Sequence, residues 1–254
     1  MGLGTVGFKV TEGLSLEDAL YFSIVTITTV GYGDIHPATL AGKWLTIVLI
    51  ITGVGTFLGV VANATEIMLS KRERTVRLQK LHMVTGAFFS DVGTKLLEVL
   101  SEYDPHLDRV KEYLLVNTGW NEQEFLRVHK ALKDHDFEVD AQKVDFEALR
   151  GFLLQKRDFL LRLLENPTLL EHESFTQLLR AVFHLTEELA YREDVSHLVD
   201  TDRAHLAGDT KRAYGSLVGQ WLDYVRYLKD NYPYLYSLAV RTNPFNRQSS
   251  PVVR

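Results

Sequence analysis

The chain has 254 residues, of which 46% are hydrophobic and 24% are charged, and its formal net charge is −5. This length allows one or two domains with a buried core, and the negative charge argues against a nucleic-acid binder. Because the sequence contains no cysteine, disulfides, thiolate metal sites and thiol redox switching are excluded, which fits a reducing compartment.

The first element expected in chain order is a short amphipathic helix over residues 16–28. Ser15 is a suitable N-cap, and the acids Glu17-Asp18 suit the positive end of the helix dipole. The carbonyl end then points toward Thr28 and Thr29, where its partial negative charge favours a cation. This helix is too short to cross a bilayer, so we interpret it as re-entrant.

Glycine alternates with other residues in the next segment, 29–33, and none of its side chains is ionisable near neutral pH. Gly31 and Gly33 permit dihedral angles that are closed to other residues, so successive carbonyl oxygens can be turned toward one side of an extended strand. A row of such oxygens can replace water around a dehydrated cation. Non-helical backbone at membrane depth is tolerated where it lines a wet path, and an ion filter meets that condition.

A long apolar helix is expected between Lys43 and Glu66, an interval that contains no charged residue. At ~1.5 Å per residue such a helix spans about 33 Å, close to the roughly 30 Å hydrocarbon core, so we expect one membrane crossing. Its glycines allow two interpretations, which can hold together. Gly53 can act as a hinge, and Gly55 with Gly59 forms a small-residue pattern for close helix packing.

Basic residues follow the apolar helix in the segment 71–80, whereas the other flank is mainly acidic. Basic residues concentrate beside the cytoplasmic ends of membrane helices, so we expect the carboxyl-terminal side to face the cytoplasm. The expected location is the cell (inner) membrane, with 71–80 as a basic cytoplasmic linker.

From residue 81 to 254 the pattern is helical throughout, and we expect a soluble bundle of about five to seven helices. Asn121 with Glu124, and Thr168 with Glu171, have the spacing of capping boxes, and Asn166-Pro167 should end a helix. Apolar residues recur at helical spacing and are assigned to the core: Phe125, Val128, Leu132, Leu149, Phe152, Leu153, Phe159, Leu160, Leu163, Leu164, Phe175, Leu178, Leu179, Val182, Phe183, Leu189, Tyr214, Leu217, Val218, Trp221, Val225 and Leu228.

Ligand sites are sparse in this helical part. His184 and Glu187 lie one turn apart and can hold a metal, with the run 171–173 (Glu-His-Glu) nearby, but surface polar residues on a helix explain both patterns equally well. The sequence shows no glycine-rich strand-to-helix turn and no catalytic constellation, so we predict neither an organic cofactor nor an enzyme. The cytoplasmic ligand and the gating stimulus are not identified by the sequence.

The stretch from about Gly4 to Leu69 resembles the pore of bacterial two-transmembrane-helix potassium channels. The residues that carry the resemblance are Glu17, Asp18, Tyr21, Phe22, Thr26, the segment Thr28-Thr29-Val30-Gly31-Tyr32-Gly33-Asp34, Pro37 and Gly53. The resemblance implies an all-α membrane pore module, consisting of a re-entrant pore helix that includes Thr26 and Thr28, a selectivity filter and an inner transmembrane helix, followed by the soluble helical bundle. It implies a role for each matched filter residue: K⁺ coordination by the carbonyl oxygens of Thr29, Val30, Gly31 and Tyr32 and by the Thr29 hydroxyl, bracing of the filter by Tyr32, a place at the outer mouth for Asp34, and a gating hinge at Gly53.

One filter segment occurs per chain, whereas a carbonyl cage around one ion needs four strands. We therefore expect a homotetramer in the lipid bilayer, with a ring of Asp34 that concentrates cations at the entrance. The expected domains are a pore module (1–70), the linker (71–80) and a helical cytoplasmic domain (81–254) with a regulatory or assembly role. The expected function is passive, potassium-selective conduction.

The stretch that precedes the pore helix, Met1–Ser15, resembles only the end of the outer helix that this channel family needs. Gly4–Phe8, followed by Glu12-Gly13, is similar to the end of that outer helix and the start of the loop that follows it. We therefore expect the chain as given to lack most of an outer helix and not to form an ordinary conducting pore by itself. The alternative function is that of a truncated, non-conducting subunit that associates with full-length channel chains.

Overall fold

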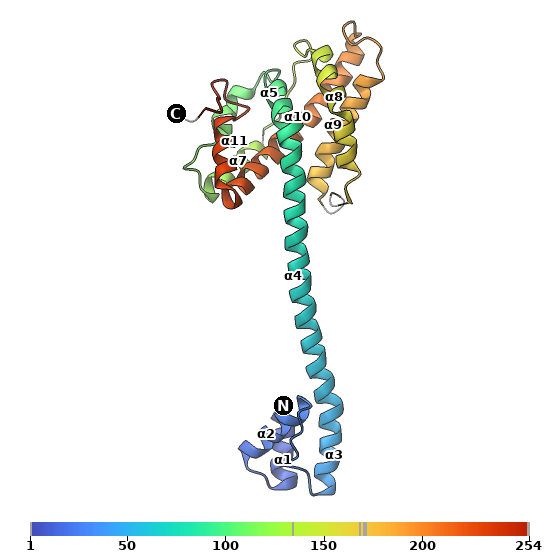
Figure 1. The fold of residues 1–254 in the computed structure, drawn as a ribbon, viewed down its shortest axis with the longest axis vertical. Helices are drawn as coiled ribbons and strands as arrows, with labels where there is room; N and C mark the ends of the chain where they lie inside the picture. The colour runs from blue at the N-terminus through green and yellow to red at the C-terminus, as the bar shows by residue number, and fades with distance from the viewer. Residues whose placement is uncertain (1, 134, 168, 170–171, 253–254) are drawn as a thin grey trace. The chain divides into compact units, whose positions relative to one another are not determined.

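The computed structural model describes residues 2–133, 135–167, 169 and 172–252. These residues are mostly helical and include no strand, which confirms the expected all-α class. The chain divides into two compact units, Met1–Val76 and Arg77–Arg254 (Figure 1).

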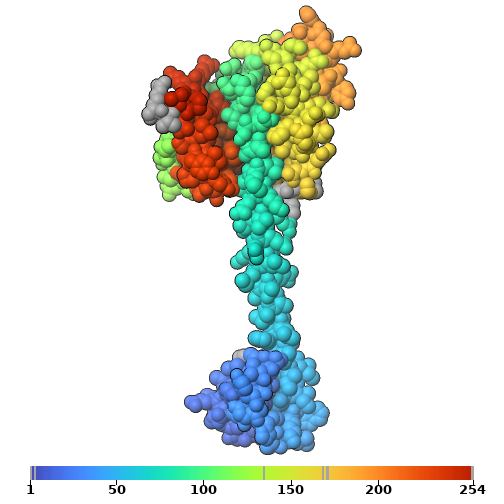
Figure 2. Space-filling model, in the orientation of Figure 1, coloured from blue at the N-terminus to red at the C-terminus, as the bar shows by residue number. Residues whose placement is uncertain are grey.

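The first unit contains α1 (Gly2–Glu12), α2 (Leu16–Ile27), α3 (Leu40–Leu49), η1 (Ile50–Val54) and the first part of α4 (Gly55–Phe88). Helix α1 packs on α2 and α3, and the three helices form one closely packed body (Figure 2, blue). Their small core consists of Phe8, Ala19, Phe22, Ile27 and Leu49. The rings of Phe8 and Phe22 meet edge to face, with their centroids 4.9 Å apart.

Side chains accept hydrogen bonds at the starts of two helices of this unit, α2 and α3. Helix α2 begins after Ser15, whose hydroxyl oxygen accepts a hydrogen bond from the N–H of Asp18 at 3.0 Å, so the predicted N-cap is confirmed. The carboxylate of Glu12, at the end of α1, accepts hydrogen bonds from the N–H of Ala38 at 2.9 Å and from the hydroxyl of Thr39 at 2.6 Å. Because Thr39 is the N-cap of α3, Glu12 ties the end of α1 to the start of α3.

The predicted apolar helix is present and belongs to a longer helical run, Leu40–Ser101. This run passes through α3, η1, α4, η2 (Phe89–Gly93) and α5 (Thr94–Ser101), so the basic segment 71–80 is itself helical. Within the described ranges, it is the one helix long and apolar enough to cross a membrane. The two π-helical turns, η1 and η2, were not predicted.

The second unit is built around one long helix, α10 (Asp200–Asn231). Helix α9 (Glu173–Ala190) packs on α10 and on α8 (Phe146–Leu164), and α10 also contacts α5, α7 and α11 (Figure 1). The unit also contains η3 (Leu107–Arg109), α6 (Lys111–Leu114), α7 (Glu122–Lys133) and α11 (Pro233–Arg241).

The apolar stripes predicted from the sequence form the core of this second unit. All of them lie in one cluster, in which Phe152, Phe159, Leu164 and Phe183 are partly buried at its edge. The cluster also includes residues from the end of α4, where the ring of Phe88 meets that of Phe175 on α9 edge to face at 5.6 Å. The end of α4 is therefore part of the core of the second unit.

Two predicted helix boundaries are also confirmed in this unit. Helix α7 begins after Asn121, whose side-chain oxygen accepts a hydrogen bond from the N–H of Glu124 at 3.1 Å. Helix α8 ends at Leu164, just before Asn166-Pro167. The second predicted capping box, Thr168 with Glu171, lies outside the described residues.

Candidate functional site

The candidate filter follows directly on the carboxyl-terminal end of α2. The carbonyl oxygen of Val25 accepts hydrogen bonds from the N–H groups of Val30 at 3.0 Å and Gly31 at 3.3 Å. The carbonyl oxygen of Thr26, in the last turn of α2, accepts one from the N–H of Thr29 at 3.1 Å. These bonds satisfy carbonyl groups that a helix end leaves without intrahelical partners, and they hold the start of the segment against that end.

The backbone of the segment 29–33 is left-handed at every second residue. The φ angle is 63° at Thr29, 56° at Gly31 and 79° at Gly33. In an ordinary strand successive carbonyl groups point to opposite sides, so reversing every second residue brings them toward the same side. This conformation uses the dihedral freedom expected of Gly31 and Gly33. At Thr29, where it was not predicted, it costs about 1–2 kcal/mol, and such strain is typical of functional sites.

On each side of the segment 29–33 a polar side chain forms a hydrogen bond with a residue of α2. The hydroxyl of Thr28 donates to the carbonyl oxygen of Ile24 at 2.8 Å, and the hydroxyl of Tyr21 donates to Oδ2 of Asp34 at 2.8 Å. The side chain of Tyr32 is 72% exposed, so the described residues of its own chain do not hold it in place.

Gly53, the candidate hinge, lies in the π-helical turn η1 against the end of α2. A Cβ atom at this position would lie 2.6 Å from Cγ1 of Ile27, the last residue of α2. At Gly55 and Gly59 a Cβ atom would meet nothing within 4 Å. Close approach of two elements is therefore one reason for a glycine at position 53, whereas Gly55 and Gly59 meet no packing partner among the described residues of this chain.

The metal pair considered from the sequence is not brought together. Glu187 forms an ion pair with Arg157 at 2.7 Å. The carboxylate near His184 belongs instead to Glu188, one residue further along α9. In the run 171–173, residue 171 lies outside the described residues.

The outward surface of α3 and η1 is apolar, as expected of a helix that meets lipid or another apolar partner. The exposed fractions of Leu40, Trp44 and Ile51 are 74%, 63% and 71%. The first unit thus combines a long apolar helix with the short capped helix α2. A segment with alternating left-handed residues follows the carbonyl end of α2.

Comparison with known proteins agrees with this arrangement. Residues 1–70 match the ion channel family, and residues 77–241 match the family described as the C-terminal helical domain of uncharacterized protein MJ1433. With the fold described above, these matches define a potassium channel-like membrane protein, a class whose permeant ion is K⁺. The chain belongs to the MJ1433 family: the uncharacterized protein MJ1433 of Methanocaldococcus jannaschii is 47% identical over 184 residues, which cover 72% of this chain and 74% of that protein.

Proteins named as potassium channels match the front of the chain. The probable potassium channel protein 2 of the same organism is 42% identical over 74 residues, covering 29% of this chain and 22% of that protein. The two-pore potassium channel 4 of Arabidopsis thaliana is 62% identical over 47 residues, covering 18% of this chain and 16% of that protein. The chain therefore spans about a fifth of the length of these channels. No solved structure matches the chain.

Proposed function

We propose that this chain is a pore-forming subunit of a potassium-selective channel, which conducts K⁺ passively through a carbonyl-lined filter. The observation that carries the proposal is the alternating left-handed backbone at Thr29, Gly31 and Gly33, directly after the carboxyl end of α2. In the proposed site the carbonyl oxygens of Thr29, Val30, Gly31 and Tyr32, with the Thr29 hydroxyl, coordinate K⁺ in place of water.

One chain supplies one side of such a site, so the proposal includes a homotetramer in which four segments surround a central axis. The exposed position of Tyr32 supports this part of the proposal, since a neighbouring subunit can supply the brace. Asp34, held by Tyr21, then forms a carboxylate ring at the outer mouth, where it concentrates cations. Gly53 is the proposed gating hinge of the inner helix.

The helical part of the chain has a regulatory or assembly role in this proposal. The basic segment 71–80 follows the apolar stretch of the inner helix, which supports a cytoplasmic position for the domain 81–254. The proposed location is the cell (inner) membrane.

The first test asks whether the segment binds K⁺ selectively. The purified chain in lipid nanodiscs should melt at a higher temperature in KCl than in NaCl of equal concentration, because a bound ion stabilises the folded assembly. Gly31→Ala should abolish this difference, since alanine at a φ of 56° is strained by about 1–2 kcal/mol and displaces the carbonyl groups. Gly13→Ala is the matched control: its φ is 68° and a Cβ atom there would meet nothing within 4 Å, so the strain is similar but lies outside the filter.

Two outcomes decide the proposal. Potassium-selective stabilisation that persists in a folded Gly31→Ala assembly would contradict the filter assignment.

A second experiment, potassium flux into liposomes, distinguishes a conducting subunit from a non-conducting one. Flux from the chain alone supports a conducting subunit, and selective binding without flux supports a non-conducting subunit that associates with full-length channel chains.

A further inference from the structure

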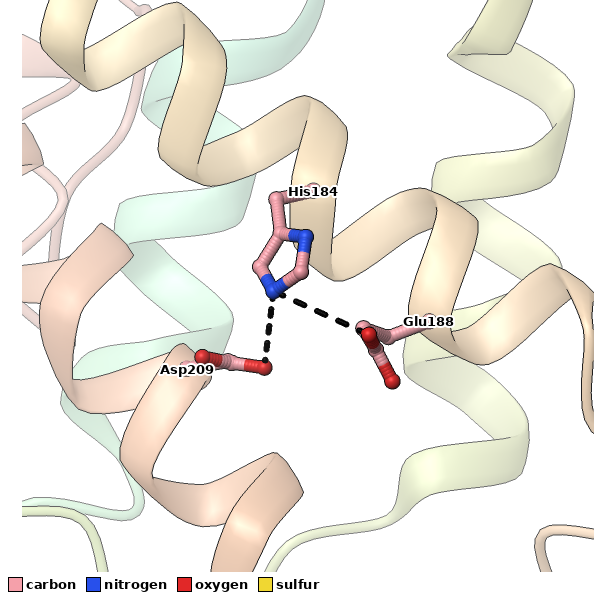
Figure 3. A group of neighbouring side chains, drawn as sticks. All are labelled: His184, Glu188 and Asp209. Carbon is pink, nitrogen blue, oxygen red and sulfur yellow. Dashed lines mark ion pairs between the residues drawn. The ribbon is translucent and has the colours of Figure 1, made fainter.

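A second cluster of ligand-type side chains lies in the helical unit, far along the sequence from the candidate filter. Helix α9 carries His184 and Glu188 one turn apart, and α10 carries His205 and Asp209 at the same spacing. Figure 3 shows one ring nitrogen of His184 facing both carboxylates, with Asp209 coming from the neighbouring helix. Two helices thus each present a His-x₃-carboxylate pair to one point.

The distances within the cluster are short and similar. Nε2 of His184 lies 3.4 Å from Oδ2 of Asp209 and 3.8 Å from Oε1 of Glu188. Nε2 of His205 lies 3.4 Å from the same Asp209 oxygen and 3.6 Å from Oε2 of Glu188. These distances exceed the roughly 2.7–3.2 Å of good hydrogen bonds, so direct hydrogen bonds do not explain the arrangement.

One oxygen of the Asp209 carboxylate lacks a hydrogen-bond donor. Asp209 is 3% exposed, and its Oδ2 atom, which faces both histidines, accepts no hydrogen bond. Its other oxygen accepts a hydrogen bond from Arg212 at 3.0 Å. A buried carboxylate oxygen that accepts no hydrogen bond is unfavourable, and nearly all such oxygens in proteins are satisfied by a donor or a cation. The missing partner of Oδ2 is therefore expected to be positively charged and placed between the two rings.

The spacing fits a metal ion. With bonds of about 2.1 Å, the ligand atoms of a tetrahedral Zn²⁺ site lie about 3.4 Å from one another. His184, Glu188 and Asp209 each offer one ligand atom, and these atoms all lie within 4.8 Å of one another. The contacts of 3.4 and 3.6 Å place His205 as the fourth residue of the set.

We propose that His184, Glu188, His205 and Asp209 bind a divalent transition-metal ion of the zinc class between α9 and α10. Two imidazoles favour this class over Mg²⁺ and Ca²⁺, which prefer oxygen ligands alone. The site adds a link between the two helices and is independent of the proposed filter, because every ligand lies in the helical unit.

Neighbouring residues prepare the site. Arg192 donates a hydrogen bond to Oε2 of Glu188 at 2.8 Å, which fixes the position of this carboxylate beside the cluster. His184 and His205 are about half exposed, so an ion can reach the cluster from solvent. His184 also lines a surface hollow together with Gln177, Arg180, Ala181, Arg212 and Ser216.

The test is a metal titration of the full chain in detergent, after removal of any polyhistidine tag. Co²⁺ should bind one ion per chain and give the visible absorption of a four-coordinate site, and Zn²⁺ should displace it. His184→Gln and His205→Gln should each weaken Co²⁺ binding more than about tenfold, since each removes a ligand. His197→Gln is the matched control, because His197 also pairs with a carboxylate, that of Asp194 at 2.8 Å, but is 87% exposed.

Circular dichroism of each variant, recorded without metal, shows whether it keeps the helical fold. Added Zn²⁺ should raise the melting temperature of the parent and of His197→Gln, but not of the two ligand variants. The proposal would be overturned if the parent bound no stoichiometric Co²⁺ or Zn²⁺, or if either folded ligand variant bound the ions as tightly as the parent.

Discussion

Arg192 connects two helices of the second unit through charged hydrogen bonds. Its Nε and Nη2 atoms donate to the two carboxylate oxygens of Asp202, on α10, at 2.9 and 2.6 Å. A third bond runs to Glu188 on α9. The two hydrogen bonds from Arg192 to Asp202 favour the ionised carboxylate, so they hold the pKa of Asp202 below its ordinary value.

We predict that Asp202→Asn destabilises the helical unit by about 1 kcal/mol at pH 7. Because the pKa of Asp202 is lower in the folded chain than in the unfolded chain, its contribution is complete above the unfolded value of about 3.9 and is lost as the pH falls below it. Parent and variant should therefore differ in melting temperature at pH 7 and converge as the pH falls through the lowered pKa of Asp202 in the folded chain.

Asp200→Asn is the control for this prediction. Asp200 lies in the same first turn of α10, so its substitution removes the same interaction with the helix dipole. A loss of stability in Asp200→Asn equal to that in Asp202→Asn would show that the dipole, and not Arg192, accounts for the effect.

Single residues also show how far the sequence could predict this structure. Ser15 and Asn121 were recognised as caps because a cap depends on neighbours within three residues. The pairing of His184 with Glu188 was missed because positions three and four residues ahead on a helix both lie within reach. Which one is used depends on the adjacent helices: Glu187 pairs with Arg157 on α8, whereas Glu188 lies near α10.

The contact between α2 and η1 offers a test of whether Gly53 is needed for close packing against Ile27 or as a hinge. Alanine at Gly53 would place its Cβ 2.6 Å from Cγ1 of Ile27, an overpacking that costs about 1–3 kcal/mol. We predict that Gly53→Ala speeds hydrogen exchange at the carboxyl end of α2, as measured by mass spectrometry. Adding Ile27→Ala should slow exchange again, because it removes the clashing atoms.

Gly55→Ala serves as the comparison, since a Cβ atom there would meet nothing within 4 Å, and it should leave exchange in α2 unchanged. If Gly53 is needed only as a hinge, Gly53→Ala should leave exchange unchanged as well and alter gating alone. That result would contradict the packing interpretation.

Helices could be predicted from the sequence where apolar residues recur at α-helical spacing, and less well where π-helical turns interrupt that spacing. The core residues of α8, α9 and α10 could be predicted, because apolar residues recur along one face of each helix. The π-helical turns η1 and η2 could not be foreseen, since five residues are too few to distinguish their period from that of an α-helix. The charged segment 71–80 has the composition of a linker, but Lys, Arg and Glu are also good helix formers, and it lies within α4.

At the scale of the whole molecule, the core of the second unit includes the end of the inner helix. Leu81, Thr85 and Phe88 are the buried residues of α4. We predict that a fragment from Arg77 to the carboxyl terminus is soluble, strongly helical and cooperatively folded, whereas one that starts at Phe89 melts at a lower temperature because it lacks these three side chains. Circular dichroism and thermal melts measure both properties.

Equal melting temperatures for the two fragments would show that the end of α4 does not contribute to folding, and a spectrum dominated by β-structure would contradict the helical fold. Light scattering on the longer fragment bears on the proposed assembly. A mass equal to one chain would indicate that residues before Arg77 drive formation of the proposed tetramer.

The hydrogen bonds of Glu12 to Ala38 and Thr39 close a ring of backbone that contains the pore helix and the candidate filter. The entropy lost in closing a flexible loop grows only with the logarithm of its length, at about 0.6 kcal/mol for each doubling. Residues inserted between Gly13 and Ser15 would therefore change the free energy of closure very little. A longer connection at this point should therefore leave the hydrogen bonds between the two ends of the ring in place.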